Sequence, residues 1–291
     1  MRRCYRVAGL TFALDLPAEH PAADRLHNYD PFQVPESRET IFSLSTVPEA
    51  PEGGRETLYA APEASGEPVV RLSRLGEDYL AEFAPRPSAP VCGQLAFDAD
   101  FRRGRLFASG SPADQTFALN NALMLLFAFA ATPFRVLEMH AAAVCRGGRA
   151  FLFLGRSGTG KSTHGALWIK HIEGTELLND DNPVLRIADD GSIRAFGTPW
   201  SGKTPCYKAE DAPVGAIVRL RQDTRNRIAR LGTVAAYASV LAACSGFRPL
   251  RAVTDAQHET LAAVAERVPC YQLDCLPDEA AARLCQSTVD G

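Results

Sequence analysis

The sequence predicts an α/β domain preceded by a small strand-rich domain. Up to about residue 110, short apolar stretches are cut by Pro and Gly, and apolar and polar residues alternate, as in Val70-Arg71-Leu72-Ser73. That pattern is typical of strands joined by long turns. Beyond a long apolar stretch, strand and helix signals alternate, as in α/β domains. We expect the first domain to span residues 1–112 and the second to span 113–291.

The apolar stretch at residues 115–134 carries no charge and could imitate a membrane span. Asn120 and Asn121 in its first half and Pro133 near its end argue against that. It is preceded by Ser111-Pro112, a typical N-cap followed by a proline at the first helical position. We therefore expect a buried helix and no membrane partner.

The remaining elements follow from apolar periodicity and turn residues. Near the N-terminus, the short apolar run Val7 to Leu14 is interpreted as a strand, because it lacks the cleavage signal of a leader peptide. In the second domain, Gly147-Gly148 marks a turn between two strands. The elements expected there are strands at 141–144, 150–154, 176–178, 216–220 and 270–273, and helices at about 161–171, 233–245, 254–266 and 277–287.

Composition limits the function classes. The chain has 291 residues, 46% of them hydrophobic, and a formal net charge of -3 with basic residues spread among acidic ones. We therefore expect a globular protein without a nucleic-acid partner, although acidic small substrates remain possible. The eight cysteines show no C-x-x-C spacing, which argues against a zinc site or a redox dithiol and favours a reducing, cytoplasmic location.

The most specific motif is Gly155-Arg156-Ser157-Gly158-Thr159-Gly160-Lys161-Ser162, which fits G-x-x-x-x-G-K-[ST] at every position. An apolar strand precedes it and a helix follows, as phosphate binding requires. Backbone N–H groups of such a loop cradle phosphates, the lysine reaches the β and γ phosphates, and the serine hydroxyl binds Mg²⁺. The residues expected to bind ATP are Gly155, Ser157, Gly158, Thr159, Gly160, Lys161, Ser162 and Thr163.

A pair of carboxylates, Asp180-Asp181, follows the apolar segment 176–178. If that strand pairs beside residues 151–154, both carboxylates lie near the phosphate loop. One carboxylate would then bind Mg²⁺ while the other takes a proton from an attacking hydroxyl. The alternative is that Asn179 to Pro183 forms only a polar turn.

Two weaker candidates complete the predicted site. His140 stands just before the strand that leads towards the loop, where it could orient a carboxylate or contact a phosphate, although a lone histidine at a strand start is more often structural. The segment Gly197 to Thr204 is rich in glycine and hydroxyl residues and could form a wall of the site. In it, Lys203 would neutralise phosphate charge, unless the segment is simply an ordered loop.

These motifs, from Met139-His140 through the loop to Asp180-Asp181, resemble the catalytic domain of bacterial HPr kinase/phosphorylase. That family shares its P-loop nucleotide-binding fold with the ATP-dependent phosphoenolpyruvate carboxykinases. The resemblance covers about residues 135–220 and implies that Lys161 and Ser162 hold phosphate and Mg²⁺. It further implies that Asp181 helps bind the metal and Asp180 acts as the base, with the two roles open to exchange. Thr163 departs from the family, which has an acidic residue there.

The leading hypothesis is therefore ATP-dependent phosphoryl transfer to a hydroxyl, on a serine of a small protein or on a small molecule, by an HPr-kinase-like enzyme. One alternative is phosphoenolpyruvate carboxykinase chemistry. Another is an ATP-binding accessory or regulatory protein with little turnover. The expected partners are ATP, Mg²⁺ and the acceptor, with a homo-oligomer also possible.

Overall fold

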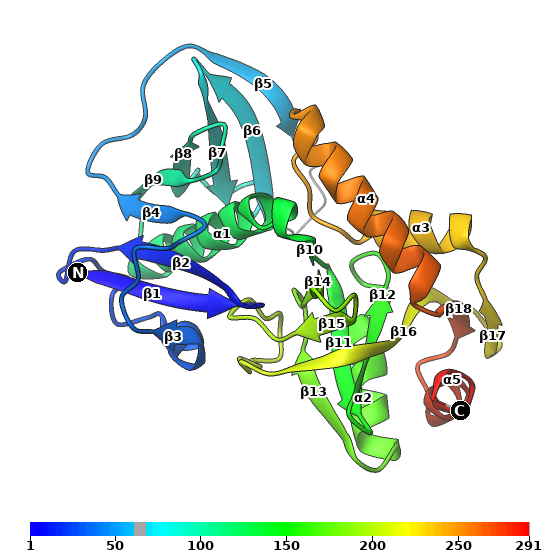
Figure 1. Cartoon of the computed structure of the whole chain (residues 1–291). Coiled ribbons are helices and arrows are strands. Elements are labelled where there is room, and N and C mark those ends of the chain that lie inside the picture. Colours follow the sequence, from blue (N-terminus) through cyan, green and yellow to red (C-terminus); the bar gives the residue numbers. More distant parts are fainter. Residues whose placement is uncertain (61–67, 291) are drawn as a thin grey trace. The chain divides into compact units, whose positions relative to one another are not determined.

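A computed structural model describes residues 1–60 and 68–290 of the chain. It is a mixed α/β structure with two large sheets and few helices. The chain divides into two compact units, Met1–Ala131 and Thr132–Gly291 (Figure 1). Residues 61–67, which belong to the expected strand-rich region, lie outside the described residues.

The N-terminal unit is built on a nine-stranded sheet in the order β3-β1-β2-β4-β9-β8-β7-β6-β5. Its strand pairs are antiparallel except β2–β4 and β4–β9, which are parallel. The predicted single strand at Val7 to Leu14 is wrong: positive φ at Ala8 and Gly9 turns the chain and makes a hairpin. The strands are β1 Arg2–Val7, β2 Leu10–Asp15, β3 Gln33–Val34, β4 Ser43–Thr46, β5 Arg55–Ala60, β6 Val69–Leu75, β7 Asp78–Ala84, β8 Gly93–Phe97 and β9 Arg103–Ala108, with the short 3-10 helix η1 His27–Phe32.

The long apolar helix α1, Pro112–Ala130, packs on β8 and β9 of this sheet. Two glycines permit the close approach: a Cβ at Gly93 would lie 2.6 Å from the Ala118 Cβ, and one at Gly104 would lie 2.6 Å from Leu126 Cδ1. The structure therefore groups α1 with the N-terminal unit, whereas the sequence had placed it at the start of the second domain. No helix among the described residues is long and apolar enough to cross a membrane.

The C-terminal unit contains a second nine-stranded sheet, in which β10-β14-β15-β16-β12-β11-β13 form a continuous path and β18 and β17 extend from β16. The strands β12, β16 and β18 are parallel. The hairpin around Gly147-Gly148 forms as predicted, and β11 pairs with β12. The strands are β10 Val136–Glu138, β11 Ala141–Arg146, β12 Arg149–Leu154, β13 Thr175–Asn179, β14 Val184–Ile187, β15 Ile193–Phe196, β16 Asp211–Gln222, β17 Arg227–Arg230 and β18 Cys270–Cys275, with the short 3-10 helix η2 Thr132–Phe134.

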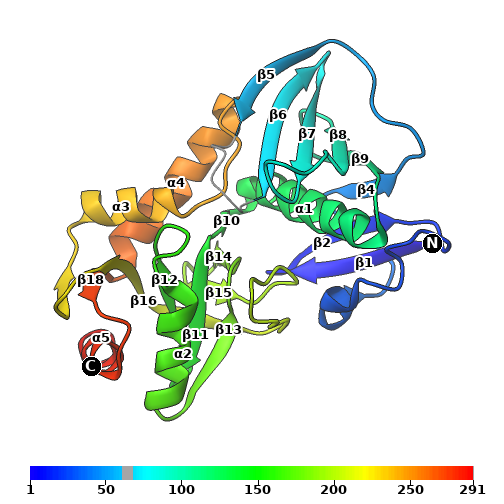
Figure 2. The ribbon, with the colours of Figure 1, turned by 180° about the vertical axis from the view of Figure 1, so that it is seen from behind.

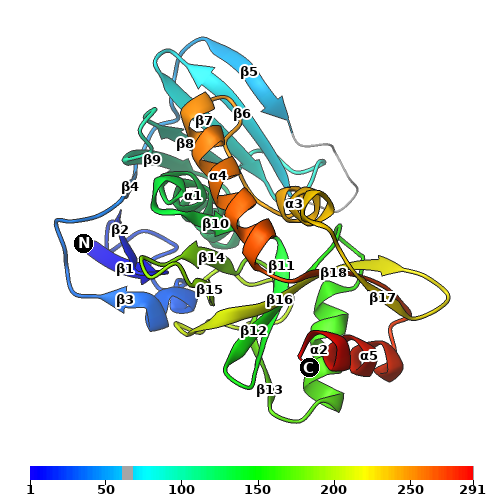
Figure 3. The same ribbon diagram turned by 45° about the vertical axis from the view of Figure 1, so that its right-hand side comes forward.

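Helices cover both faces of the central strands of this sheet. On one face, α2 (Lys161–His171) and α5 (Glu279–Val289) lie side by side, with Trp168 and Cys285 in one apolar cluster (Figures 2 and 3). On the other face, α3 (Thr233–Ala242) and α4 (Arg251–Arg267) pack on a second cluster that includes Leu152 and Ile217. The helix α2 has the predicted bounds, while α3 ends three residues before the expected Ser245 because the chain turns to pair Cys244 with Met139.

Candidate functional site

The glycine-rich segment 155–162 joins the end of β12 to the start of α2. The strand β12 lies inside the sheet, between β11 and β16, and its residues Phe151 to Phe153 are fully buried. The segment therefore leaves the sheet where the parallel strands β12, β16 and β18 end. In α/β structures, that edge is where ligands commonly bind.

Glycine is required in this segment for conformational and steric reasons. Gly158 and Gly160 have φ angles of +78° and +105°, a left-handed region that is costly for residues with a Cβ. A Cβ on Gly155 would lie 3.0 Å from the Thr159 Cβ, so a larger residue would push against that side chain. The loop is closed by a hydrogen bond of 3.0 Å from the Thr159 N–H to the Arg156 carbonyl.

The N-terminus of α2 is left open. Its N-cap is Gly160, which offers no side-chain hydrogen bond to the first turn. In the part of the chain that the structure describes, the N–H groups of Ser157, Gly158 and Gly160 donate no hydrogen bond. The side chains of Ser162 and Thr163 lie on the exposed first turn. Unused N–H groups at the positive end of a helix dipole favour an anion.

Lys161 is buried, with 7% of its surface exposed, and its ammonium group folds back towards the start of the loop. The Nζ atom lies 3.1 Å from the Gly155 carbonyl oxygen and 3.1 Å from His140 Nε2. These two contacts fix the cation beside the glycine loop. The lysine therefore lies at the mouth of the loop rather than extending freely into solvent.

His140 connects the lysine to the aspartate pair. Its Nε2 atom also lies 3.3 Å from Asp181 Oδ1. This nitrogen can accept a hydrogen bond from the Lys161 ammonium when it carries no proton. When it carries a proton it can instead donate a hydrogen bond to Asp181, so it cannot do both at once. The backbone fixes this geometry, because the His140 N–H donates to the Ala243 carbonyl at 2.7 Å and the Ala141 N–H donates to the Asp181 carbonyl at 2.9 Å.

Asp180 faces the segment 197–204. It is 3% exposed, and its Oδ2 atom accepts a hydrogen bond of 3.0 Å from the Thr204 N–H. A Cβ on Gly202 would lie 3.1 Å from the Asp181 Cβ, so glycine permits the segment to pass close over the aspartate pair. The segment that the sequence proposed as a wall of the site thus contacts both aspartates.

The fully buried Asn179 organises this region, although no local motif predicted a role for it. Its Nδ2 donates to Thr198 Oγ1 and to the Trp200 carbonyl, both at 3.1 Å. Its Oδ1 accepts from the N–H groups of Asp181 at 2.9 Å and Asn182 at 2.8 Å. One amide therefore orients the aspartate turn and anchors the segment 197–204. An asparagine that begins an Asn-Asp-Asp-Asn turn is the signal that could have revealed it.

The condition on which Asp180-Asp181 were placed near the loop, pairing of their strand beside residues 151–154, is not met. The strand β13 pairs with β11, and β11 separates it from β12. Asp181 is still linked to Lys161, because His140 precedes β11 directly and its Nε2 lies within 3.3 Å of Asp181 Oδ1 and 3.1 Å of Lys161 Nζ. Lys203 is exposed, and within residues 1–60 and 68–290 it makes no hydrogen bond or ion pair with the site.

Another contact to the loop was not predicted. Gln222, the last residue of β16, donates from Nε2 to the Gly158 carbonyl at 3.2 Å. The strands β12 and β16 are parallel neighbours, so β16 carries this side chain to the edge where the loop begins. No local motif marks a glutamine at a strand end, and only the strand order reveals the contact.

Burial changes the ionisation of two groups near the site. Desolvation lowers the pKa of His164 to about 4, so this histidine is neutral, and its Nε2 accepts a hydrogen bond of 3.1 Å from Trp168 Nε1 one turn along the same helix. Desolvation raises the pKa of Glu138 to about 7, and the neighbouring Asp181 charge acts in the same direction. Both carboxyl oxygens of Glu138 are buried without a hydrogen-bond partner in the described structure.

No group of three or more His, Cys, Asp or Glu residues in the described ranges is arranged to hold a metal ion. Asp181 and Ser162 remain the predicted Mg²⁺ ligands. Mg²⁺ usually retains several waters and takes only one or two protein carboxylates together with substrate phosphates, so these residues would suit a metal that arrives with a nucleotide.

No protein-family model matches this sequence, and no relative was found among curated proteins. Among solved structures, the chain is similar to the Hpr(Ser) kinase/phosphatase from Coxiella burnetii. The sequence identity is 13%, the match covers 53% of this chain and 88% of that chain, and the TM-score is 0.32. At that level of similarity, the function must be argued from the site itself.

Proposed function

We propose that this protein is an ATP-dependent phosphotransferase that transfers the γ phosphoryl group to a hydroxyl, in the manner of an HPr-kinase-like enzyme. The observation that carries the proposal is the contact series from Lys161 through His140 to Asp181 at the mouth of the glycine loop. It joins a cation suited to phosphate with a carboxylate suited to metal binding. The loop contributes unused N–H groups beside them.

The roles follow from position. Lys161 and the loop N–H groups would bind the β and γ phosphates and oppose the charge that develops on them. Ser162 and Asp181 would bind Mg²⁺, which when present supplies further neutralisation of phosphate charge. His140 would keep Asp181 and Lys161 oriented by its shared contact with both.

Asp180 would act as the base. It faces the segment 197–204, whose residues Gly202 to Thr204 are exposed, so an acceptor can meet the site on this side. The acceptor hydroxyl gives its proton to Asp180 while its oxygen bonds to the γ phosphorus. The bond from that phosphorus to the bridging oxygen breaks, and ADP leaves. Because Asp180 is buried, the covering segment must shift for the acceptor to bind.

The test is incubation with γ-labelled ATP, Mg²⁺ and a cell extract, using the native protein, Asp180→Asn and Asp189→Asn. The Asp189 side chain is 97% exposed, so its variant is a matched control for the chemical change. We expect Asp180→Asn to bind Mg-ATP normally in calorimetry but to lose about 100-fold or more of the labelling rate, as expected for a general base. The control should retain full activity.

Three outcomes contradict parts of the proposal. Equal labelling by the native protein and Asp180→Asn removes the base role from Asp180. Binding of Mg-ATP without transfer to any acceptor favours the accessory-protein alternative. Absence of Mg-ATP binding overturns the proposed function as a whole.

A further inference from the structure

A concentration of positive charge lies beside the glycine loop, at the end of β16 and in β17. Residues 219–230 contain five arginines and one acidic residue, Asp223, in a chain whose net charge is -3. All five arginines are exposed. This departs from the expectation that basic residues are spread among acidic ones, because β16 and β17 pair with opposite edges of β18 and so bring these side chains together.

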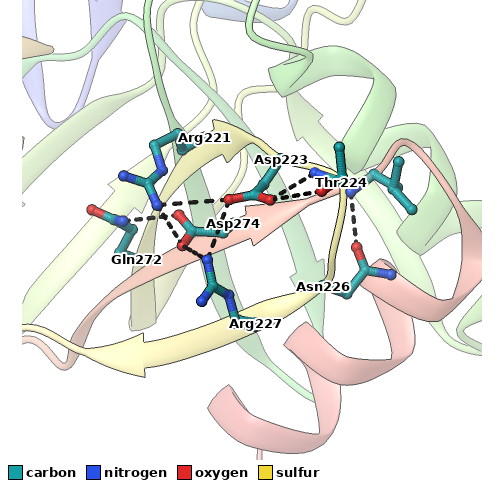
Figure 4. Close-up of polar contacts among 8 residues, drawn as sticks. Arg221, Asp223, Thr224, Asn226, Arg227, Gln272 and Asp274 are labelled. Carbon is teal, nitrogen blue, oxygen red and sulfur yellow. Dashed lines mark hydrogen bonds and ion pairs between the residues drawn. The ribbon is translucent and has the colours of Figure 1, made fainter.

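Strand register brings two of the arginines to one buried carboxylate. Arg221 in β16 and Arg227 in β17 both stand opposite Asp274 in β18. The Asp274 Oδ2 atom lies 2.7 Å from Arg221 NH2 and 3.6 Å from Arg227 NH2 (Figure 4). The side chain of Asp274 is only 12% exposed, and its Oδ1 accepts from Gln272 Nε2 at 2.8 Å.

The ion pairs hold the guanidinium groups in place but leave them accessible. The side chains of Arg221 and Arg227 remain 57% and 65% exposed. Each guanidinium has five N–H donors, more than its contacts with Asp274 and Asp223 can use. Arg219 and Arg225 make no ion pair within the described part of the chain. The result is a pre-organised cationic surface, because little side-chain freedom is lost when Arg221 and Arg227 bind a ligand.

The surface is adjacent to the candidate active site. Arg219 stands beside Leu154, the last residue of β12 before the glycine loop. Gln222 follows Arg221 directly and donates to the Gly158 carbonyl of that loop. A ligand on the arginines would therefore lie next to any phosphate bound by the loop.

We propose that four exposed arginines, Arg219 and Arg221 at the end of β16, Arg225 in the turn that follows and Arg227 in β17, dock an acidic segment of a polypeptide acceptor and so present its hydroxyl to the loop. This inference rests on the proposed function, because it specifies the class of acceptor. Arg219 and Arg221 are alternate residues of one strand, about 6.6 Å apart, which matches the spacing of alternate side chains in an extended peptide. Guanidinium groups also pair with carboxylates through two parallel hydrogen bonds.

A nucleic acid fits the surface less well. Its affinity comes from neutralising many phosphates along an extended basic stripe. Here the charge is confined to the end of β16, the turn after it and β17, with Asp223 and Asp274 between the arginines. A short acidic peptide needs only a few well-placed cations.

The test measures binding of a fluorescent peptide of alternating Glu and Ser to the full chain, without nucleotide, by fluorescence anisotropy. A peptide with Gln in place of Glu is the neutral probe, and an oligothymidine is the nucleic-acid probe. The patch variant is Arg219→Glu with Arg225→Glu, which leaves the Asp274 cluster intact. The control is Lys170→Glu with Arg267→Glu, an equal change of charge in the last turns of α2 and α4, at the opposite edge of the parallel strands.

We expect the acidic peptide to bind, the neutral probe not to bind, and the patch variant to lose affinity about tenfold or more while the control retains it. Binding should weaken at high salt, as for exposed charges. Equal loss in both variants, equal binding of the neutral probe, or tighter binding of the oligothymidine would overturn the inference.

Phosphoryl transfer is then tested separately with the same peptide and γ-labelled ATP. If labelling of the peptide falls in the patch variant but not in the control, the arginines bind the peptide as an acceptor for phosphoryl transfer. If the protein binds the acidic peptide but not Mg-ATP, the proposed function fails while the docking surface stands. If it binds and hydrolyses Mg-ATP but ignores the peptide, the docking surface fails alone.

Discussion

The helices α1 and α2 differ in the capping of their N-termini. The helix α1 begins with a capping box: Ser111 Oγ accepts from the Asp114 N–H at 3.2 Å, and Asp114 Oδ2 accepts from the Ser111 N–H at 3.0 Å. The helix α2 begins at Gly160 with no side-chain cap. A glycine with positive φ stands at or just before each N-cap, namely Gly110 and Gly160, so both turns are tight.

The difference concerns where the first N–H groups find partners. In α1 the Ser111 side chain accepts a hydrogen bond from a first-turn N–H group. The hydrogen bonds from Ser111 also lower the pKa of Asp114. In α2 the chain supplies no side-chain acceptor, while the Lys161 ammonium lies beside the loop. A capped terminus serves the stability of its own unit, whereas an uncapped one beside a cation suits an external anion. Three substitutions test whether the two helix termini differ in this way.

The largest effect is expected for Lys161→Ala. Removing the ammonium should weaken Mg-ATP binding about 10- to 100-fold, because a hydrogen bond to a charged group contributes about 1.5–3 kcal/mol. Isothermal titration calorimetry measures this directly. Lys170→Ala, at the exposed far end of the same helix, should leave affinity unchanged. Unchanged affinity in Lys161→Ala would show that the open helix terminus does not bind the triphosphate.

Gly160→Ala should have an intermediate effect. A Cβ at φ +105° costs about 1–2 kcal/mol, so the C-terminal unit should unfold at lower urea concentration. Both tryptophans, Trp168 and Trp200, lie in that unit, so tryptophan fluorescence reports its unfolding. Gly232→Ala is the matched control, because Gly232 is the N-cap of α3 with φ -70° and open space around its Cβ position. Equal shifts in both variants would contradict the conformational argument.

The smallest effect is expected for Ser111→Ala, which removes a cap worth about 1 kcal/mol. Because α1 belongs to the N-terminal unit, far-UV circular dichroism should show an earlier transition while tryptophan fluorescence does not change. Mg-ATP affinity should also stay constant, and Ser111→Asn should restore stability. A loss of nucleotide affinity in Ser111→Ala would remove the distinction between the two helix termini.

Features that depend on neighbouring residues in the sequence could be predicted from it. The N-cap at Ser111, the turn at Gly147-Gly148 and the bounds of α2 all follow from side-chain hydrogen bonding, glycine conformation or apolar spacing. The candidate site was predicted in the same way, as a list of chemically suited residues. The roles of Asn179 and Gln222 were not predicted, because their hydrogen-bond partners are remote in sequence.

Local sequence was enough to identify the residues that could form a phosphate-binding loop, because positive φ angles demand glycine and a strand–loop–helix succession can be recognised locally. The position of β11 between β12 and β13, and the contacts of His140 with both Lys161 and Asp181, became known only from the folded chain. The folded chain likewise showed that arginines from two strands meet at Asp274. Strand order depends on how apolar faces pack across the whole unit, and no local pattern of residues records that choice.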